Sequence, residues 1–495
     1  MNERMTFRKT GNNMKNFFLI IKEKYNALST ILKASIWFFA CTFLQKGISV
    51  LTTPIFTRLM LPSEYGVVST YLSVSDLMSI LITLGLASSV YQKKVIQIED
   101  SAERNRFTSS LQGLATTTAI ISFIFYLFNH KWINSLIGLP SILILSVFPG
   151  VLSVTAFGFW SMLQRTEYRY VKLVQLTLAT SLAKPIVGII AILLWPQNKV
   201  YSRVLSLVLV EVISYTYLYI KCFWDGKCFY DKKYWKYALR FVLPLIPHYF
   251  FQRILLSSSQ LMIKRMVGNY EAGIYSIGNS VGWVLTLLVT ALDYTMAPWT
   301  YQKLKERKTV ELGQFVTIPI ALMAAFCLIL ISFAPEIVSV FAPSAYHDAI
   351  WVIPPIVMCT YFMLVYTFFI YFEYYYEQTS RIMLATAISG VLCAILNYVF
   401  IRIFGYLAAA YATLICYILY TFFHYLIYRN ICFKEFGACI YNGKIICVIS
   451  ILLIALSLTI TFFYNHLLIR IGIASVIVIG IILNYNAFMR LVKKD

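Results

Sequence analysis

The stretch FLQKGISVLTTPIFTRLM, residues 43–60, begins as an apolar membrane span and places Lys46 inside it. A charged side chain at the centre of a bilayer costs about 3 kcal/mol by insertion measurements, so it needs a partner or a polar cavity. The composition around this segment is that of a membrane protein. Of 495 residues, 60% are hydrophobic and 13% are charged, whereas soluble proteins have about 25% charged residues.

Windows of about 20 mainly apolar residues, the length that crosses a bilayer, recur along the whole chain. The predicted fold class is therefore an all-α polytopic membrane protein with about 14 transmembrane helices and no separate soluble domain. The predicted spans are 32–59, 64–91, 107–128, 141–163, 172–195, 204–222, 238–264, 271–300, 312–333, 348–373, 382–402, 406–428, 445–464 and 470–489.

The basic residues indicate how these spans are oriented. With the N-terminus inside the cell, about 31 of the 42 Lys and Arg residues fall in cytoplasmic segments and about 8 on the outer side, as the positive-inside rule requires. The basic N-terminal segment, 1–31, and the tail, 490–495, are then both cytoplasmic. The net charge of +21 mostly reflects this topology and gives no reason to expect nucleic acid as a partner.

The chain also contains an internal repeat. TRLMLPSEYGVVS at 57–69 aligns without a gap with KRMVGNYEAGIYS at 264–276, so that Gly66 matches Gly273 at an offset of 207 residues. This offset covers six spans, and an even number gives two halves of the same orientation, an arrangement that recurs in transporters. We expect an N-terminal lobe, a C-terminal lobe and two further helices, at 32–222, 238–428 and 445–489.

The same offset relates Lys46 to Arg253, so each half carries one cation at the same depth of its first span. Ammonium and guanidinium groups bind phosphate through charge-assisted hydrogen bonds. We therefore take the cations within spans and at two span ends as candidate substrate-binding residues: Lys46, Arg253, Lys184, Arg58 and Arg265.

Polar and acidic side chains follow helical spacing on the same spans, which favours a polar cavity over lipid exposure. The candidates for lining this cavity, or for coupling to a proton or sodium ion, are Asp76, Asp293, Glu211, Ser49, Thr53, Ser73, Gln260, Asn279 and His248. The structural alternative is that the charges form buried ion pairs, Lys46 with Asp76 for example. Because the cations outnumber the acids, a cavity with surplus positive charge is the preferred interpretation.

No motif indicates enzymatic chemistry. The sequence has no phosphate-binding glycine loop, no HExxH, no nucleophile elbow and no cluster at metal-ligand spacing. We therefore predict that the protein is not an enzyme and has no cofactor or metal site, which leaves a secondary carrier as the best class.

Three stretches resemble one transporter family. Residues 46–91, 237–250 (YALRFVLPLIPHYF) and 375–420 are similar to spans one and two, span seven, and spans eleven and twelve of Wzx-type oligosaccharide flippases. These flippases belong to the multidrug/oligosaccharidyl-lipid/polysaccharide exporter (MOP) superfamily. The sequence departs from the pattern at Gln260, where members often have an acidic residue.

The resemblance implies a flippase for surface polysaccharide biosynthesis in the bacterial cytoplasmic membrane. The substrate would be a polyprenyl-pyrophosphate-linked oligosaccharide, moved by alternating access through a cationic cavity between two six-helix lobes in a MATE-like V. A glycan polymerase and other assembly proteins would be partners. The alternatives are a multidrug or organic-cation exporter of the same fold, whose cavity should be acidic, a flippase of peptidoglycan precursors, and a non-transporting scaffold.

Overall fold

The computed structural model describes residues 30–483, which form helices and no strand. Twelve of the described helical segments are long and apolar enough to cross a membrane. The predicted all-α polytopic fold is confirmed. The predictions for 1–29 and for the tail 490–495 lie outside the described residues, as does the end of the last predicted span.

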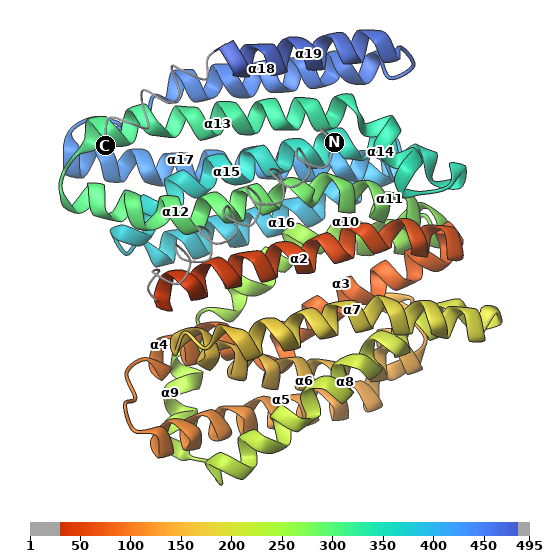
Figure 1. The fold of residues 1–495 in the computed structure, drawn as a ribbon, viewed down its shortest axis with the longest axis vertical. Coiled ribbons are helices and arrows are strands. Elements are labelled where there is room, and N and C mark those ends of the chain that lie inside the picture. The colour runs from red at the N-terminus through yellow and green to blue at the C-terminus, as the bar shows by residue number, and fades with distance from the viewer. Residues whose placement is uncertain (1–29, 484–495) are drawn as a thin grey trace, which may run out of the picture.

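The N-terminal lobe is a bundle in which α8 packs against α5, α6 and α7, and α7 packs against α2. In Figure 1 this bundle occupies the lower half of the molecule. Its long helices are α2 (Thr30–Leu59), α3 (Pro62–Thr83), α5 (Ser101–Ile137), α6 (Ser141–Thr166), α7 (Tyr170–Leu194) and α8 (Lys199–Gly226). Its short elements are η1 (Ala87–Tyr91), α4 (Gln92–Val95) and η2 (Pro196–Asn198).

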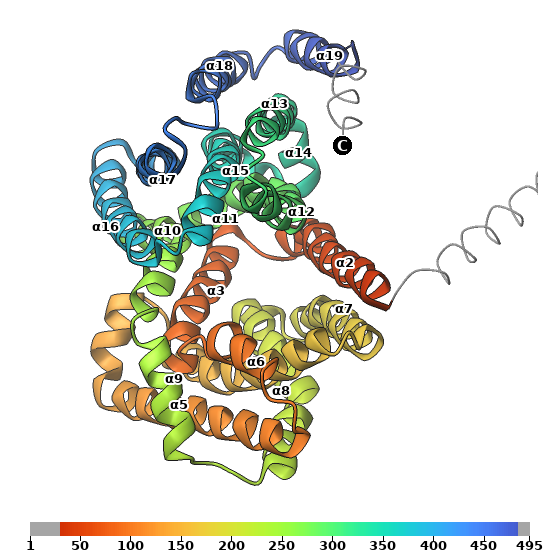
Figure 2. The ribbon, with the colours of Figure 1, turned by 90° about the vertical axis from the view of Figure 1, so that its left-hand side faces the viewer.

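The C-terminal lobe centres on α15, which packs against α17 and α13, while α16 packs against α10 and α17. Its long helices are α10 (Ile246–Met266), α11 (Asn269–Gly282), α12 (Thr286–Lys305), α13 (Thr309–Ser332), α15 (Ile353–Tyr375), α16 (Thr379–Phe404) and α17 (Ala408–Phe436). Its short elements are η3 (Trp283–Leu285), α14 (Ala334–Phe341) and η4 (Ser344–Trp351). The connecting helix α9 (Lys232–Val242) packs against α5 and η1 of the N-terminal lobe. The last two helices, α18 (Gly443–Phe462) and α19 (Leu467–Leu483), pack against α13 at the edge of the molecule (Figures 1 and 2).

Two predicted spans are interrupted by turns in the structure, and a third, 271–300, by the short helix η3 between α11 and α12. The second, 64–91, leaves the helix after Thr83, because Leu84 and Gly85 take left-handed backbone angles (φ 53° and 63°) before the short π-helix η1. The seventh, 238–264, is split between α9 and α10. Pro244 lies at this break and Pro247 in the first turn of α10, where proline is tolerated because its missing N–H has no helical partner.

The two lobes meet where α3 packs against α10 and α11 (Figure 2). At this seam a Cβ on Gly66 would lie 1.9 Å from the Asn269 carbonyl oxygen, and a Cβ on Gly273 would lie 1.9 Å from the Pro62 carbonyl oxygen. The two glycines are a matched pair of the repeat, and so are Pro62 and Asn269. The contact is therefore reciprocal, and each glycine is needed because the opposite backbone occupies the place of a side chain.

Further hydrogen bonds close the seam at the same end of the bundle. Thr57 Oγ1 donates to the Phe341 carbonyl at 2.6 Å, and the Tyr346 hydroxyl donates to the Met60 carbonyl at 3.2 Å. This is the end that the positive-inside rule predicts to face outward.

Candidate functional site

Two adjoining cavities lie between the lobes. The first, here called the basic chamber, has a volume of about 300 Å³ and is lined by α2, α3, α8, α11, η3 and α12 together with Phe341. The second, the mixed chamber, has a volume of about 410 Å³ and is lined by α3, α6, α8, Arg253 of α10 and the turn before η1. Leu72 of α3 lines both chambers, so they share a wall.

Lys46 lies in the basic chamber. It comes from the face of α2 that also presents Ser49 and Thr53, as the helical spacing predicts. Lys46 is exposed and makes no ion pair with any residue of the described range 30–483. The alternative pairing of Lys46 with Asp76 is not formed, so an ammonium group stands free in the cavity.

Arg203 is a second cation of this chamber, and the sequence analysis missed it. It directly precedes the predicted span 204–222, but α8 begins at Lys199, one turn earlier. Its guanidinium stacks on the Phe56 ring at 3.8 Å and donates to the Lys184 carbonyl at 3.2 Å. No Asp or Glu is among the residues that line the basic chamber.

The mixed chamber contains charges of both signs. Arg253 Nη1 lies 3.6 Å from Asp76 Oδ2 across the two lobes, with both side chains about half exposed. Glu211 also lines this chamber and accepts a hydrogen bond from Lys184 Nζ at 2.7 Å. The ion-pair alternative therefore holds for Lys184 and Arg253, two of the three predicted cations within spans.

The structure brings neither Arg58 nor Arg265 into a chamber. Arg58 Nη2 donates to the Val340 carbonyl at 3.0 Å, so it belongs to the seam between the lobes. Arg265 is exposed at the end of α10. Their match in the repeat reflects equivalent helix ends and not a shared cavity.

Five predicted polar residues also lie outside both chambers. Gln260 Nε2 donates to Ser69 Oγ at 2.7 Å and so joins α10 to α3 across the seam. The other four contact residues of their own lobe. Ser73 donates a hydrogen bond to the Ser69 carbonyl, and Asn279 and Asp293 accept hydrogen bonds from Trp283 and Tyr371. The His248 ring lies beside the Tyr249 ring. Within the described part of the chain, no group of three or more His, Cys, Asp or Glu residues has the geometry of a metal site.

Comparison with known proteins gives a family and a fold. The model of the polysaccharide biosynthesis protein family matches residues 31–302, more than half of the chain. No curated protein matches the sequence. Among solved structures, the chain is similar to the lipid II flippase MurJ in an inward closed conformation, with 14% identity, a TM-score of 0.68, and 91% of this chain and 99% of that chain covered.

Two further structures share the fold. An inward-facing MATE family transporter of the MOP superfamily is 11% identical, with a TM-score of 0.61 and 79% of this chain and 96% of that chain covered. A MOP superfamily transporter from Pyrococcus furiosus is 15% identical, with a TM-score of 0.51 and coverages of 82% and 96%. The helix arrangement is thus that of the MOP superfamily.

Proposed function

The chain belongs to the family of polysaccharide biosynthesis proteins and has the fold of MOP superfamily transporters, and on that premise we propose that it is a lipid-linked oligosaccharide flippase. It would move a polyprenyl-pyrophosphate-linked oligosaccharide from the cytoplasmic to the outer leaflet of a bacterial cytoplasmic membrane. The observation that carries the proposal is the basic chamber, whose charged lining residues are Lys46 and Arg203.

The chamber fits a pyrophosphate better than an organic cation. Lys46 offers an unpaired ammonium group, and the Arg203 guanidinium is held in a fixed plane by the Phe56 ring. A guanidinium in a fixed orientation binds phosphate oxygens through two parallel hydrogen bonds. The hydroxyls of Ser49 and Thr53 on the same wall would hydrogen-bond the sugar, and the polyprenyl tail would stay in lipid. A cationic substrate would meet only like charge here.

The ion pair in the mixed chamber offers a route to energy coupling. Arg253 and Asp76 come from different lobes, so their pair must break when the lobes separate there. A proton or sodium ion that neutralised Asp76 would release Arg253 for the substrate anion. In this proposal Asp76 is the coupling site and Arg253 the group that it controls.

Alternating access would then be a rocking of the lobes 32–222 and 238–428, with 445–489 carried along on the second lobe. The seam at the Gly66–Gly273 contact closes the end predicted to be outer, which supports an inward-facing state. Both termini would lie in the cytoplasm, and a glycan polymerase and other assembly proteins would receive the flipped unit.

A complementation experiment tests the proposal. The gene is deleted in its own host, and wild type, Lys46→Gln, Arg203→Gln or the control Lys131→Gln is returned at matched membrane levels. Lys131 is an exposed lysine of the outer end of α5, away from both chambers. Polyprenyl-linked oligosaccharide and surface glycan are then quantified.

We expect the deletion to accumulate lipid-linked oligosaccharide and to lose surface glycan. Wild type and Lys131→Gln should restore export, and the two chamber variants should reduce it about tenfold or more, the effect of losing one charge-assisted contact of about 1.5–3 kcal/mol. Unchanged glycan with altered tolerance to cationic drugs would favour the exporter alternative. Full rescue by both chamber variants would be consistent with a flippase but would show that its substrate does not depend on the basic chamber.

A further inference from the structure

A further cavity lies not between the lobes but inside the N-terminal lobe. It has a volume of about 770 Å³ and lies among the first turns of α5 and α7 and the last turns of α6 and α8. It shares no lining residue with either chamber, because α6 presents Val154 and Gly158 to the mixed chamber and Phe159 and Leu163 to this cavity. We call it the N-lobe cavity.

The cavity lies at the end of the bundle predicted to be cytoplasmic, where α5 begins and α8 ends. Its volume is within the range of small-molecule sites, about 300–1,000 Å³. The wall combines aromatic rings, Phe159 and Trp160 among them, with charged side chains. Sites that bind organic anions commonly combine these two kinds of side chain.

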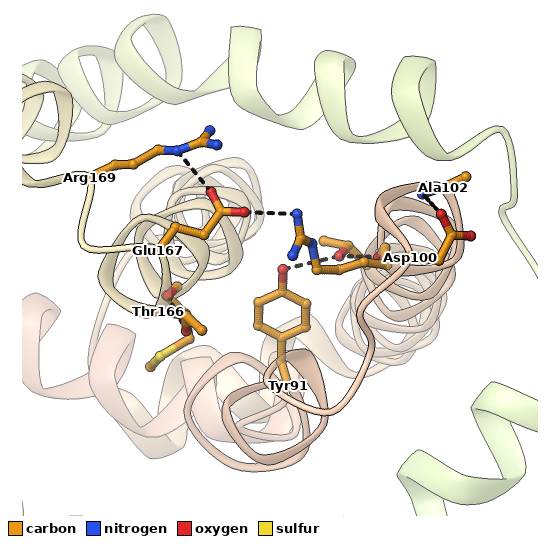
Figure 3. A network of polar contacts seen from close by, with 9 residues as sticks. Tyr91, Asp100, Ala102, Thr166, Glu167 and Arg169 are labelled. Carbon is orange, nitrogen blue, oxygen red and sulfur yellow. Dashed lines mark hydrogen bonds and ion pairs between the residues drawn. The ribbon is translucent and has the colours of Figure 1, made fainter.

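One carboxylate holds two guanidinium groups at the mouth of the cavity. Glu167 Oε1 lies 2.8 Å from Arg104 Nη2, and Glu167 Oε2 lies 3.1 Å from Arg169 Nε (Figure 3). The single negative charge of Glu167 cannot neutralise both. Arg104 Nε is moreover buried without a hydrogen-bond acceptor, and a buried donor left unpaired is unfavourable.

Two lysines increase the positive charge of the same wall. Lys172 lines the cavity and pairs with no acid in the described chain, and Lys221 lies 3.7 Å from Asp225. The lining thus has four cations against the two acids Glu167 and Asp225. Surplus positive charge, an unpaired buried donor and open space in one place point to a missing anion.

Helix packing alone does not explain why the N-lobe cavity is open. At the same end of the C-terminal lobe the helices α15 and α17 are filled with rings: Phe372 lies 4.9 Å from Tyr428, and Tyr428 stacks on Tyr441 at 5.1 Å. An unfilled space between helices lowers the free energy of unfolding, because the side chains around it lose packing contacts. The C-terminal lobe also has a cavity at this end, of about 680 Å³, but residues 439–447 line most of it, and α13, α15 and α16 do not contribute to it.

We propose that the N-lobe cavity is a binding site for a phosphate-bearing ligand, separate from the transport path. The phosphate would lie against Arg104, Lys172 and Lys221, and the remainder of the ligand against Phe159 and Trp160. Two sources share this chemistry: the headgroup of an anionic phospholipid of the inner leaflet, and a soluble phosphate compound of the cytoplasm. The site does not depend on which substrate the lobes move.

The test uses the purified full chain and two probes. Native mass spectrometry measures bound phosphatidylglycerol against phosphatidylcholine, and equilibrium dialysis measures bound inorganic phosphate. The variants are Lys172→Gln/Lys221→Gln, which keeps the Arg104–Glu167–Arg169 contacts, and Arg104→Gln, which removes the unpaired donor. The control, Lys232→Gln/Lys233→Gln, removes two exposed lysines of α9 at the same end of the molecule.

We expect one probe to bind, and to bind at least tenfold more weakly to both cavity variants than to the control. Selective binding of phosphatidylglycerol identifies a lipid headgroup, and binding of inorganic phosphate identifies a soluble ligand. The proposal is overturned if neither probe binds wild type, or if the control loses as much binding as the cavity variants. Thermal unfolding of each variant separates loss of the site from loss of the fold.

Discussion

At the end that carries most of the basic residues, the N-terminal lobe is hollow and charged, whereas the C-terminal lobe is filled with aromatic rings. In each lobe a glycine of the helix that begins at this end lies against a carbonyl group of a later connection. A Cβ added to Gly113 of α5 would lie 1.9 Å from the Phe229 carbonyl oxygen, and one added to Gly313 of α13 would lie 2.6 Å from the Ile440 carbonyl oxygen. The two lobes thus both have close helix–backbone contacts here and differ in the side chains around them.

The buried polar groups of the two ends differ in the same way. Tyr168 after α6 and Glu377 after α15 both take a left-handed φ of 54°, and four residues before them stand Gln164 and Glu373. Gln164 lines the N-lobe cavity. Glu373 is fully buried and bonds His424 Nδ1 at 2.8 Å. At matched positions, therefore, the N-terminal lobe has a side chain beside open space, and the C-terminal lobe has a buried, hydrogen-bonded pair.

The largest expected effect is in the filled end. His424→Phe leaves the Glu373 carboxylate buried without its partner, which should lower the free energy of unfolding by about 3–5 kcal/mol. Gln164→Leu, at the matched position beside open space, should change it by about 1 kcal/mol or less. Thermal unfolding of both variants in one detergent measures the difference.

A double variant sharpens this prediction. Glu373→Leu/His424→Phe replaces the whole pair by apolar groups, so it should recover most of the stability that His424→Phe loses, since an apolar replacement of a buried pair is often neutral. Equal losses for His424→Phe and Gln164→Leu would show that the two ends do not differ in rigidity.

Hydropathy predicted the all-helical membrane fold because membrane length and apolar composition are local properties of the sequence. It could not predict which charges remain free. Arg253 meets Asp76 only because α10 of one lobe faces α3 of the other, and that pairing depends on the arrangement in space. Arg203 was missed for a related reason, since its position at a window edge gave no sign that the side chain turns inward onto Phe56. The N-lobe cavity is a space that no sequence pattern marks.

The seam is where the lobes are alike, so matched substitutions there should act alike. Gly66→Ala and Gly273→Ala each place a Cβ 1.9 Å from an opposite carbonyl oxygen, and overpacking of this kind costs about 1–3 kcal/mol. Each should shift the protein about tenfold toward the state with an open seam. Hydrogen exchange at the first turns of α3 and α11 measures the shift.

Gly47→Ala is the matched control for the seam, because an added Cβ there meets no atom within 4 Å. It should leave hydrogen exchange at the seam unchanged. A response to Gly66→Ala without one to Gly273→Ala would mean that the reciprocal contact is not equally strained on its two sides.

One substitution should make the N-lobe cavity resemble the ring-packed end of the C-terminal lobe. Leu163 stands five residues before Tyr168, as Phe372 stands five before Glu377, so Leu163→Phe adds to the N-lobe cavity the ring that its counterpart has. We expect about 1 kcal/mol of added stability from filling the space, together with weaker binding of the phosphate probe. Thermal unfolding and the dialysis assay give the two readings. Lower stability with unchanged binding would mean that the ring does not enter the cavity.

The smallest expected effect concerns the N-termini of α5 and α13, the helices that begin at this end of the two lobes. The Asp100 carboxylate accepts the backbone N–H groups of Glu103 and Ala102 at 3.0 and 3.1 Å, which holds its pKa below the ordinary 3.8, whereas α13 has no side-chain cap. A lowered pKa means that the cap stabilises α5 fully above pH 3.8 and is lost as the pH falls below that value.

Protection factors for hydrogen exchange at the first turn of α5 should therefore fall in Asp100→Ala at pH 7. The gap from wild type should close as the pH drops below 4, because the protonated wild-type side chain no longer accepts both N–H groups. The first turn of α13, which begins without such a cap, should not respond to the substitution at any pH. A gap that persisted in acid would mean that Asp100 acts through packing and not through its charge, and the two lobes would then begin these helices in the same way.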